Sequence, residues 1–190
     1  KHFFISTYMF KTFHTFTVES VTNGHPDKVC DQISDAILDA CLTDDPPSRV
    51  AVETFGGHHM LVIGGEVTTT AHPNYDAIGR QVYKDIGYTD ELKVIVNVAE
   101  QSRDIGQGVD TGGAGDQGIM YGYATNETKE MLPSAVVKVH QLTRGLQELR
   151  EAKTLPWLMP DGKAQISVLE GKVNAVLVST QHLASVSQEE

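Results

Sequence analysis

The sequence of 190 residues is short of the features that mark disulfide-rich, secreted and membrane proteins. It has only two cysteines, Cys30 and Cys41, and both fall on one predicted helix, too far apart to bridge, so we interpret them as reduced thiols. No apolar run approaches the ~18 residues of a membrane span. The opening residues lack the apolar core and cleavage site of a secretory signal. These absences predict a cytoplasmic protein without a disulfide framework.

Positive charge is also scarce, since 15 lysines and arginines face 25 aspartates and glutamates, for a net charge of −10. That balance argues against nucleic acid or an acidic membrane as a partner. A polyanionic substrate would need a local cluster of cations or bound metal ions. Hydrophobic residues at 40% and charged residues at 21% are typical of a soluble globular protein of one or two domains.

Common nucleotide and nucleophile motifs are missing or stand in the wrong context. There is no G-x-x-x-x-G-K-[ST] phosphate loop and no G-x-S-x-G elbow. Residues 113–118 spell G-x-G-x-x-G, but a glycine-rich stretch precedes them instead of a strand, and Lys138 stands where the dinucleotide fingerprint needs an acid. The histidines form no evident metal set. We therefore predict neither a Rossmann fold nor a local nucleophile-and-base pair.

What the sequence does contain is alternating helical and strand periodicity. Residues 1–16 fit either a strand or a frayed extension, whereas residues 101–118 hold six glycines and three aspartates and are expected to be a mobile loop without regular structure. The segment 155–160 is expected to be a rigid connector that leads into a polar turn at 161–163. The order of elements predicts an α+β fold of repeated units, with helices on one face of mixed sheets. Helices are expected over 25–42, 73–86 and 133–152, and strands over 49–55, 60–70, 93–99, 166–169 and 173–180.

The helix that starts near Pro26 has a first turn suited to an anion. Pro26 fits the first helical position, which places His25 at or near the N-cap. A helix N-terminus presents free N–H groups and partial positive charge, to which Lys28 and a protonated His25 would add, and Asp27 offers a hard oxygen ligand for Mg²⁺. A well-capped surface helix whose first turn touches only water explains the same residues equally well.

Two carboxylates stand out inside apolar strand segments. Glu53 and Glu66 both lie in runs rich in valine and isoleucine or glycine, where a charged side chain is unusual. An ordinary outward-facing strand position is the simpler interpretation of each.

Eight segments in the same order resemble the methionine adenosyltransferase (S-adenosylmethionine synthetase) family over nearly the whole chain. Glu19-Ser20-Val21 leads into GHPDK at 24–28 and DQISDAILDA at 31–40. The other segments are GGEVTT at 64–69, QSRDIGQGVD at 101–110, GAGDQGIMYGYATNET at 113–128, TLPWLMPDGKAQ at 154–165 and VLVSTQH at 176–182.

The resemblance implies an enzyme that makes S-adenosylmethionine from ATP and L-methionine and releases phosphate and pyrophosphate. It implies an N-terminal α+β domain over 1–100, a mobile gating loop over 101–115 and a central α+β domain over 116–190, with the family's C-terminal domain absent. It also implies Mg²⁺ and K⁺ as cofactors, and a homodimer or dimer of dimers whose active sites lie at the subunit interface.

The resemblance also assigns roles to single positions. His25 would contact the ATP phosphates and help the leaving group, and Lys163 would face phosphate. Further ATP contacts are expected at Lys28, Asp161 and Gly162, methionine contacts at Glu66, Gln101 and Asp116, an Mg²⁺ ligand at Asp27 and the K⁺-associated carboxylate at Glu53.

A second hypothesis is a non-catalytic fragment or subunit that needs a complementary chain. In a chain of net charge −10, only Lys28 and Lys163 are expected to meet the triphosphate. We therefore expect this chain alone to bind nucleotide weakly and to turn over slowly or not at all.

Overall fold

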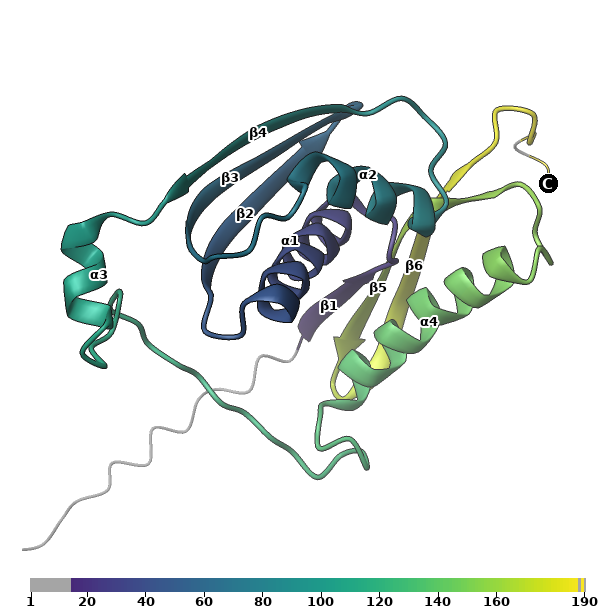
Figure 1. The fold of residues 1–190 in the computed structure, drawn as a ribbon. Helices are drawn as coiled ribbons and strands as arrows, with labels where there is room; N and C mark the ends of the chain where they lie inside the picture. Colours follow the sequence, from purple (N-terminus) through teal and green to yellow (C-terminus); the bar gives the residue numbers. More distant parts are fainter. Residues whose placement is uncertain (1–14, 188, 190) are drawn as a thin grey trace, which may run out of the picture.

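The computed structural model describes residues 15–187 and 189 as two three-stranded sheets with helices packed against them (Figure 1). One sheet has the order β1-β5-β6 and the other the order β2-β3-β4. In chain order the elements are β1 (Thr15–Val21), α1 (Pro26–Asp44), β2 (Arg49–Gly57), β3 (Met60–Thr68), α2 (Tyr75–Ile86), β4 (Lys93–Glu100), α3 (Arg103–Val109), α4 (Ser134–Glu151), β5 (Leu158–Leu169) and β6 (Lys172–His182).

The β2-β3-β4 sheet is mixed. β2 and β3 form an antiparallel hairpin, and β3 and β4 run parallel, joined by a crossover that contains α2. Helices α1 and α2 pack on one face of this sheet and leave the other face open (Figure 1). The core between them is formed by Val29, Ile33, Ile37, Cys41, Val52, Leu61, Ile63, Ile86 and Leu92.

The β1-β5-β6 sheet is antiparallel and is covered by α4 (Figure 1). Along β5 every second residue from Leu158 to Val168 is buried, so that face packs on Ala135 and Val139 of α4. Its first strand comes from the other end of the chain, because β1 pairs with β5 from Thr15↔Leu169 to Val21↔Lys163.

The predicted α+β architecture and most predicted elements are confirmed. Helix α1 begins at Pro26 as expected, and it buries Val29, Ile33 and Ile37 on one face. Helix α2 ends at Gly87, whose φ of 116° is a left-handed conformation that glycine tolerates well. Within the described residues, no helix is long and apolar enough to cross a membrane.

Two local predictions are wrong. Residues 161–163 are not a turn but part of β5, because Gly162 pairs with β6 and Lys163 pairs with both β1 and β6. The glycine-rich stretch contains the short helix α3, which Ser102 caps by accepting a hydrogen bond from the backbone of Asp104. Of residues 1–16, for which the sequence fits either a strand or a frayed extension, residues 15 and 16 begin β1, and residues 1–14 lie outside the described part.

Candidate functional site

The entrance of α1, which we call the helix mouth (residues 24–28), has a defined hydrogen-bond pattern. His25 is the N-cap, and its Nδ1 accepts the N–H of Asp27 at 3.3 Å. With Nδ1 as the acceptor, neutral His25 carries its hydrogen on Nε2, where it can donate to an anion. Pro26 has no N–H, so among the first three helical residues only the Lys28 amide has no partner in the described part of the chain. Of the free N–H groups that the sequence predicts for an anion in this first turn, one therefore remains, that of Lys28.

The helix mouth is fastened to β5. Thr22 donates its backbone N–H to the carbonyl of Gly162 at 2.9 Å and its hydroxyl to the carbonyl of Pro160 at 2.7 Å. Gly24 packs so closely on Pro160 that a Cβ there would lie 2.5 Å from the Pro160 carbonyl carbon and oxygen. These contacts bring the predicted phosphate-binding segments, 25–28 and 161–163, to one place from opposite ends of the chain.

Both lysines predicted to meet phosphate are already paired with carboxylates. Lys163 contacts Glu19 at 2.8 Å, across the β1–β5 ladder on the face away from α4. Lys28 contacts Asp31 at 3.0 Å, one turn further along α1. A phosphate group that uses either ammonium has to displace or share its carboxylate partner.

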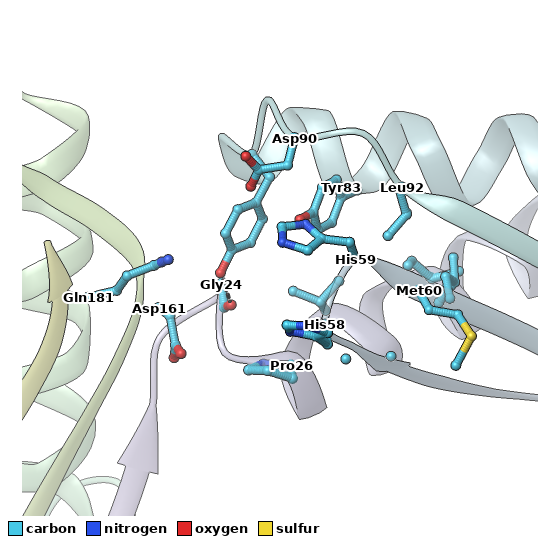
Figure 2. Close-up of a pocket in the computed structure, with 16 residues that line it drawn as sticks. Gly24, Pro26, His58, His59, Met60, Tyr83, Asp90, Leu92, Asp161 and Gln181 are labelled. Atoms are coloured by element: carbon cyan, nitrogen blue, oxygen red, sulfur yellow. Dashed lines mark hydrogen bonds between the residues drawn. The ribbon is translucent and has the colours of Figure 1, made fainter. Parts of the chain in front are cut away.

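A pocket of about 210 Å³ lies behind the helix mouth. Figure 2 shows Gly24, Pro26 and Asp161 on one side and His58 and His59 of the β2–β3 turn on another. Asp161 is the one predicted site residue that lines it. The predicted site is thus an exposed surface next to this pocket and not the pocket itself.

The Tyr88 side chain closes the inner wall of this pocket. Its hydroxyl donates to the carbonyl of Gly24 at 2.5 Å, and its ring stacks on Tyr83 with centroids 4.6 Å apart. Burial, followed by the nearby charge of Asp161, raises the pKa of the Tyr88 phenol far above its ordinary value. Tyr88 therefore stays a neutral donor and holds the helix mouth in position.

Three other predicted residues gather on the open face of the β2-β3-β4 sheet. Glu53 and Glu66 both point away from the helices. Val52 faces the core, so its neighbours Ala51 and Glu53 face the opposite side of the sheet, and Glu66 pairs with Ala51 and shares that side. Gln101 follows β4 and accepts a hydrogen bond from Thr68, two residues beyond Glu66 on the same strand. The outward-facing interpretation of both glutamates is thus correct, and both share the face on which Gln101 lies.

Asp116 does not join either group. It lies exposed in the segment after α3, where its carboxylate accepts the backbone N–H of Gln117. Among the residues that the structure describes, no three His, Cys, Asp or Glu side chains are placed to hold a metal ion. The Asp27 side chain is 89% exposed, and its carboxylate lies 3.8 Å from Nδ1 of His25. A carboxylate in that setting can give one oxygen to a cation that brings its other ligands with it.

Comparison with known families shows to which family the chain belongs. A model of the S-adenosylmethionine synthetase N-terminal domain matches residues 13–105, and a model of the central domain of the same enzyme matches residues 111–190. The chain belongs to the S-adenosylmethionine synthetase family.

Two curated members of the family are close in sequence. The S-adenosylmethionine synthase of Sorangium cellulosum (strain So ce56) is 48% identical over 193 residues, which cover 91% of this chain and 46% of the relative. That of Thermosynechococcus vestitus (strain NIES-2133 / IAM M-273 / BP-1) is 46% identical over 201 residues, which cover 91% and 48%. The chain spans about half the length of these members of the methionine adenosyltransferase family.

Tyr88 and Arg49 were not predicted from the sequence as site residues. Tyr88 reaches the helix mouth from 64 positions away, which no local pattern reveals. Arg49 opens β2 and contacts Gln101 and Asp110, the two ends of the QSRDIGQGVD segment. The signal for Arg49 in the sequence was a charged residue at the start of a predicted strand.

Proposed function

We propose that this chain supplies part of the site that makes S-adenosylmethionine from ATP and L-methionine. The observation that carries the proposal is the fastening of the helix mouth to β5 by Thr22 and Gly24, which joins residues 22–24 to residues 160–162 of the strand that holds Lys163. Membership of the S-adenosylmethionine synthetase family supports it.

The chemistry suits the residue types. A lone pair of the methionine sulfur forms the bond to ribose C5′, and the C5′–O bond breaks, so the electron pair leaves with the triphosphate. Water then cleaves the triphosphate to phosphate and pyrophosphate. A thioether has no proton to lose, so the attack needs no general base, and the task is to orient the reactants and stabilise the leaving charge.

Residues of this chain divide that task. His25 donates from Nε2 to a phosphate oxygen, and Lys163 exchanges Glu19 for phosphate, so these two are the proposed catalytic residues. The further ATP contacts are Lys28, Asp161 and Gly162. The methionine contacts are Glu66, Gln101 and Asp116.

Two cations are part of the proposal, Mg²⁺ at Asp27 and K⁺ at Glu53. The exposed Asp27 carboxylate fits Mg²⁺, which is commonly held by one or two carboxylates together with substrate phosphates and water. Bound there, Mg²⁺ would offset triphosphate charge. Glu53 offers a single exposed carboxylate on the open sheet face.

The same open faces favour a second subunit. Phe55 on β2 is 68% exposed and Leu177 on β6 is 58% exposed, and both belong to sheet surfaces that carry no helix. We propose a homodimer or dimer of dimers that buries these faces and completes the site, in the cytoplasm.

The proposed organisation of the chain is an N-terminal domain over 1–100, a gate over 101–115 and a central domain over 116–190.

The alternative is a non-catalytic fragment that becomes active only with a complementary chain. It is favoured by the ion pairs that already occupy Lys28 and Lys163. The test is to incubate the purified chain with ATP, L-methionine, Mg²⁺ and K⁺ and to measure S-adenosylmethionine, alone and with the C-terminal half of a relative added. Robust product from the chain alone would reject the fragment hypothesis, whereas product only in the mixture would support it.

Single substitutions test the assignment of the site. In the active form, whether alone or complemented, Asp27→Asn and Lys163→Ala should each remove most of the activity, because one loses a metal ligand and the other a phosphate contact. Lys172→Ala, at the start of β6, is the matched control and should keep it. Wild-type rates in both site variants would overturn the proposed function.

A further inference from the structure

One arginine joins the three strands of the open sheet face at their common edge. Arg49 begins β2 and pairs in register with Thr68 at the end of β3. Because β4 runs parallel to β3, Gln101 leaves the sheet at this same edge, and its N–H continues the ladder to Val67 at 2.9 Å. The topology therefore places Arg49, Thr68 and Gln101 together, although they are far apart in sequence.

The side chains of Arg49 and Thr68 converge on a single oxygen of Gln101. Oε1 of Gln101 accepts hydrogen bonds from Arg49 Nε at 3.3 Å, Arg49 Nη2 at 3.1 Å and the Thr68 hydroxyl at 3.1 Å. The two Arg49 donors determine which way the amide is turned, because a guanidinium cannot accept a hydrogen bond from the amide nitrogen. Nε2 of Gln101, which has no partner among the described residues, is thereby kept as a donor for a ligand.

The same guanidinium also binds the far end of the segment that follows. Nη1 of Arg49 contacts the Asp110 carboxylate at 2.9 Å, directly after α3. One side chain thus bonds a residue on each side of α3, Gln101 before it and Asp110 after it. Glycines 106 and 108 weaken that helix, so its two ends need fastening from outside.

We propose that Arg49 is a positioning residue: it orients the Gln101 amide toward methionine and, through Asp110, ties down α3. The first part rests on the proposed function, in which Gln101 contacts methionine. The second part concerns the structure of this chain alone and can be tested without any activity.

The first experiment measures hydrogen exchange of the chain by mass spectrometry. Arg49→Met should speed the exchange of amides in residues 102–112 by about fivefold, because it removes charge-assisted bonds that are partly exposed to solvent. Asp110→Asn, a change at a largely exposed site, should speed exchange at the end of α3 and leave Gln101 oriented. The matched control is Arg80→Met, which removes an arginine paired with Asp76 on α2 and should leave α3 unchanged. Unchanged exchange of α3 in Arg49→Met would overturn the tie.

The second experiment separates orientation from general structure. In the complemented enzyme, Arg49→Met should raise the KM for methionine about tenfold and change the KM for ATP by less than about twofold. Arg49→Lys keeps the charge but cannot reach the amide and Asp110 together, so it should recover only part of the loss. Equal changes in both KM values would overturn the orienting role.

Glu66→Gln serves as the reference for the methionine site itself. If it raises the KM for methionine and Arg49→Met does not, the orienting role of Arg49 is wrong while the proposed function stands. If neither variant affects methionine, the proposed methionine site is wrong, and faster exchange in Arg49→Met still supports the tie of α3.

Discussion

Replacing Gly24 by alanine should separate the helix mouth from β5. The new Cβ would lie 2.5 Å from the Pro160 carbonyl, about 0.9 Å closer than the 3.4 Å at which ordinary contact begins. The backbone cannot move away freely, because Tyr88 holds the Gly24 carbonyl and Thr22 holds the preceding turn. Overpacking of about 1–3 kcal/mol and a weakened buried hydrogen bond of about 1 kcal/mol together predict a loss of about 2–4 kcal/mol in the free energy of unfolding.

Urea unfolding at fixed protein concentration measures this loss. Trp157, the single tryptophan, lies three residues before Pro160, so its fluorescence reports on the affected strand, and circular dichroism reports on the whole chain. The midpoint should fall by roughly 1 M urea. Gly145→Ala is the matched control, since a Cβ there meets no atom within 4 Å. Alanine in place of glycine should stabilise helix α4 by about 0.5–1 kcal/mol. If Gly24→Ala unfolds at the wild-type midpoint, the close packing described above is wrong.

Three further outcomes are expected in the same assay. Tyr88→Phe should lower the free energy of unfolding by about 1 kcal/mol near neutral pH, through the lost bond to Gly24. Because burial raises the folded-state pKa of Tyr88, its contribution is complete below the unfolded pKa of about 10 and declines above it, so the difference from wild type should shrink in alkali. The Thr70 N–H donates to Asp45 at 2.7 Å and lowers the pKa of that carboxyl. Asp45→Ala should therefore lower the free energy of unfolding at neutral pH, and this difference from wild type should disappear as the pH falls below about 3–4 and the carboxylate is protonated. Ile37→Ala empties a fully buried core position and should cost about 2–5 kcal/mol, and a loss below about 1 kcal/mol would contradict its place in the core.

The sequence was sufficient for features that depend on local spacing. Val29, Ile33 and Ile37 recur every four positions along α1, and all three are buried. Pro26 and the glycine after α2 marked helix ends because their backbone preferences act within one turn. The motif order predicted the family, which the comparisons confirm.

Features set by distant partners could not be predicted in the same way. Residues 161–163 look like a turn because Asp-Gly is common in turns, but pairing with β1 and β6 on both sides overrides that preference. α3 was missed because its glycines argue against a helix, while its fastening by Arg49 comes from another strand. The assignments of single site residues remain predictions from the resemblance. The structure adds that Glu53, Glu66 and Gln101 share one face.

The pairing of β1 with β5 has a consequence for biosynthesis. Thr17 and Ser167, which contact each other across this ladder, are 150 positions apart. At ribosomal rates of about 5–20 residues per second, β1 waits roughly 8–30 seconds for its partner strand to be made. During that time α1 and the β2-β3-β4 sheet can form, but the unpaired edge of β1 is open to wrong partners. Slow synthesis or a pause before residue 158 should therefore increase the demand of this chain for chaperones.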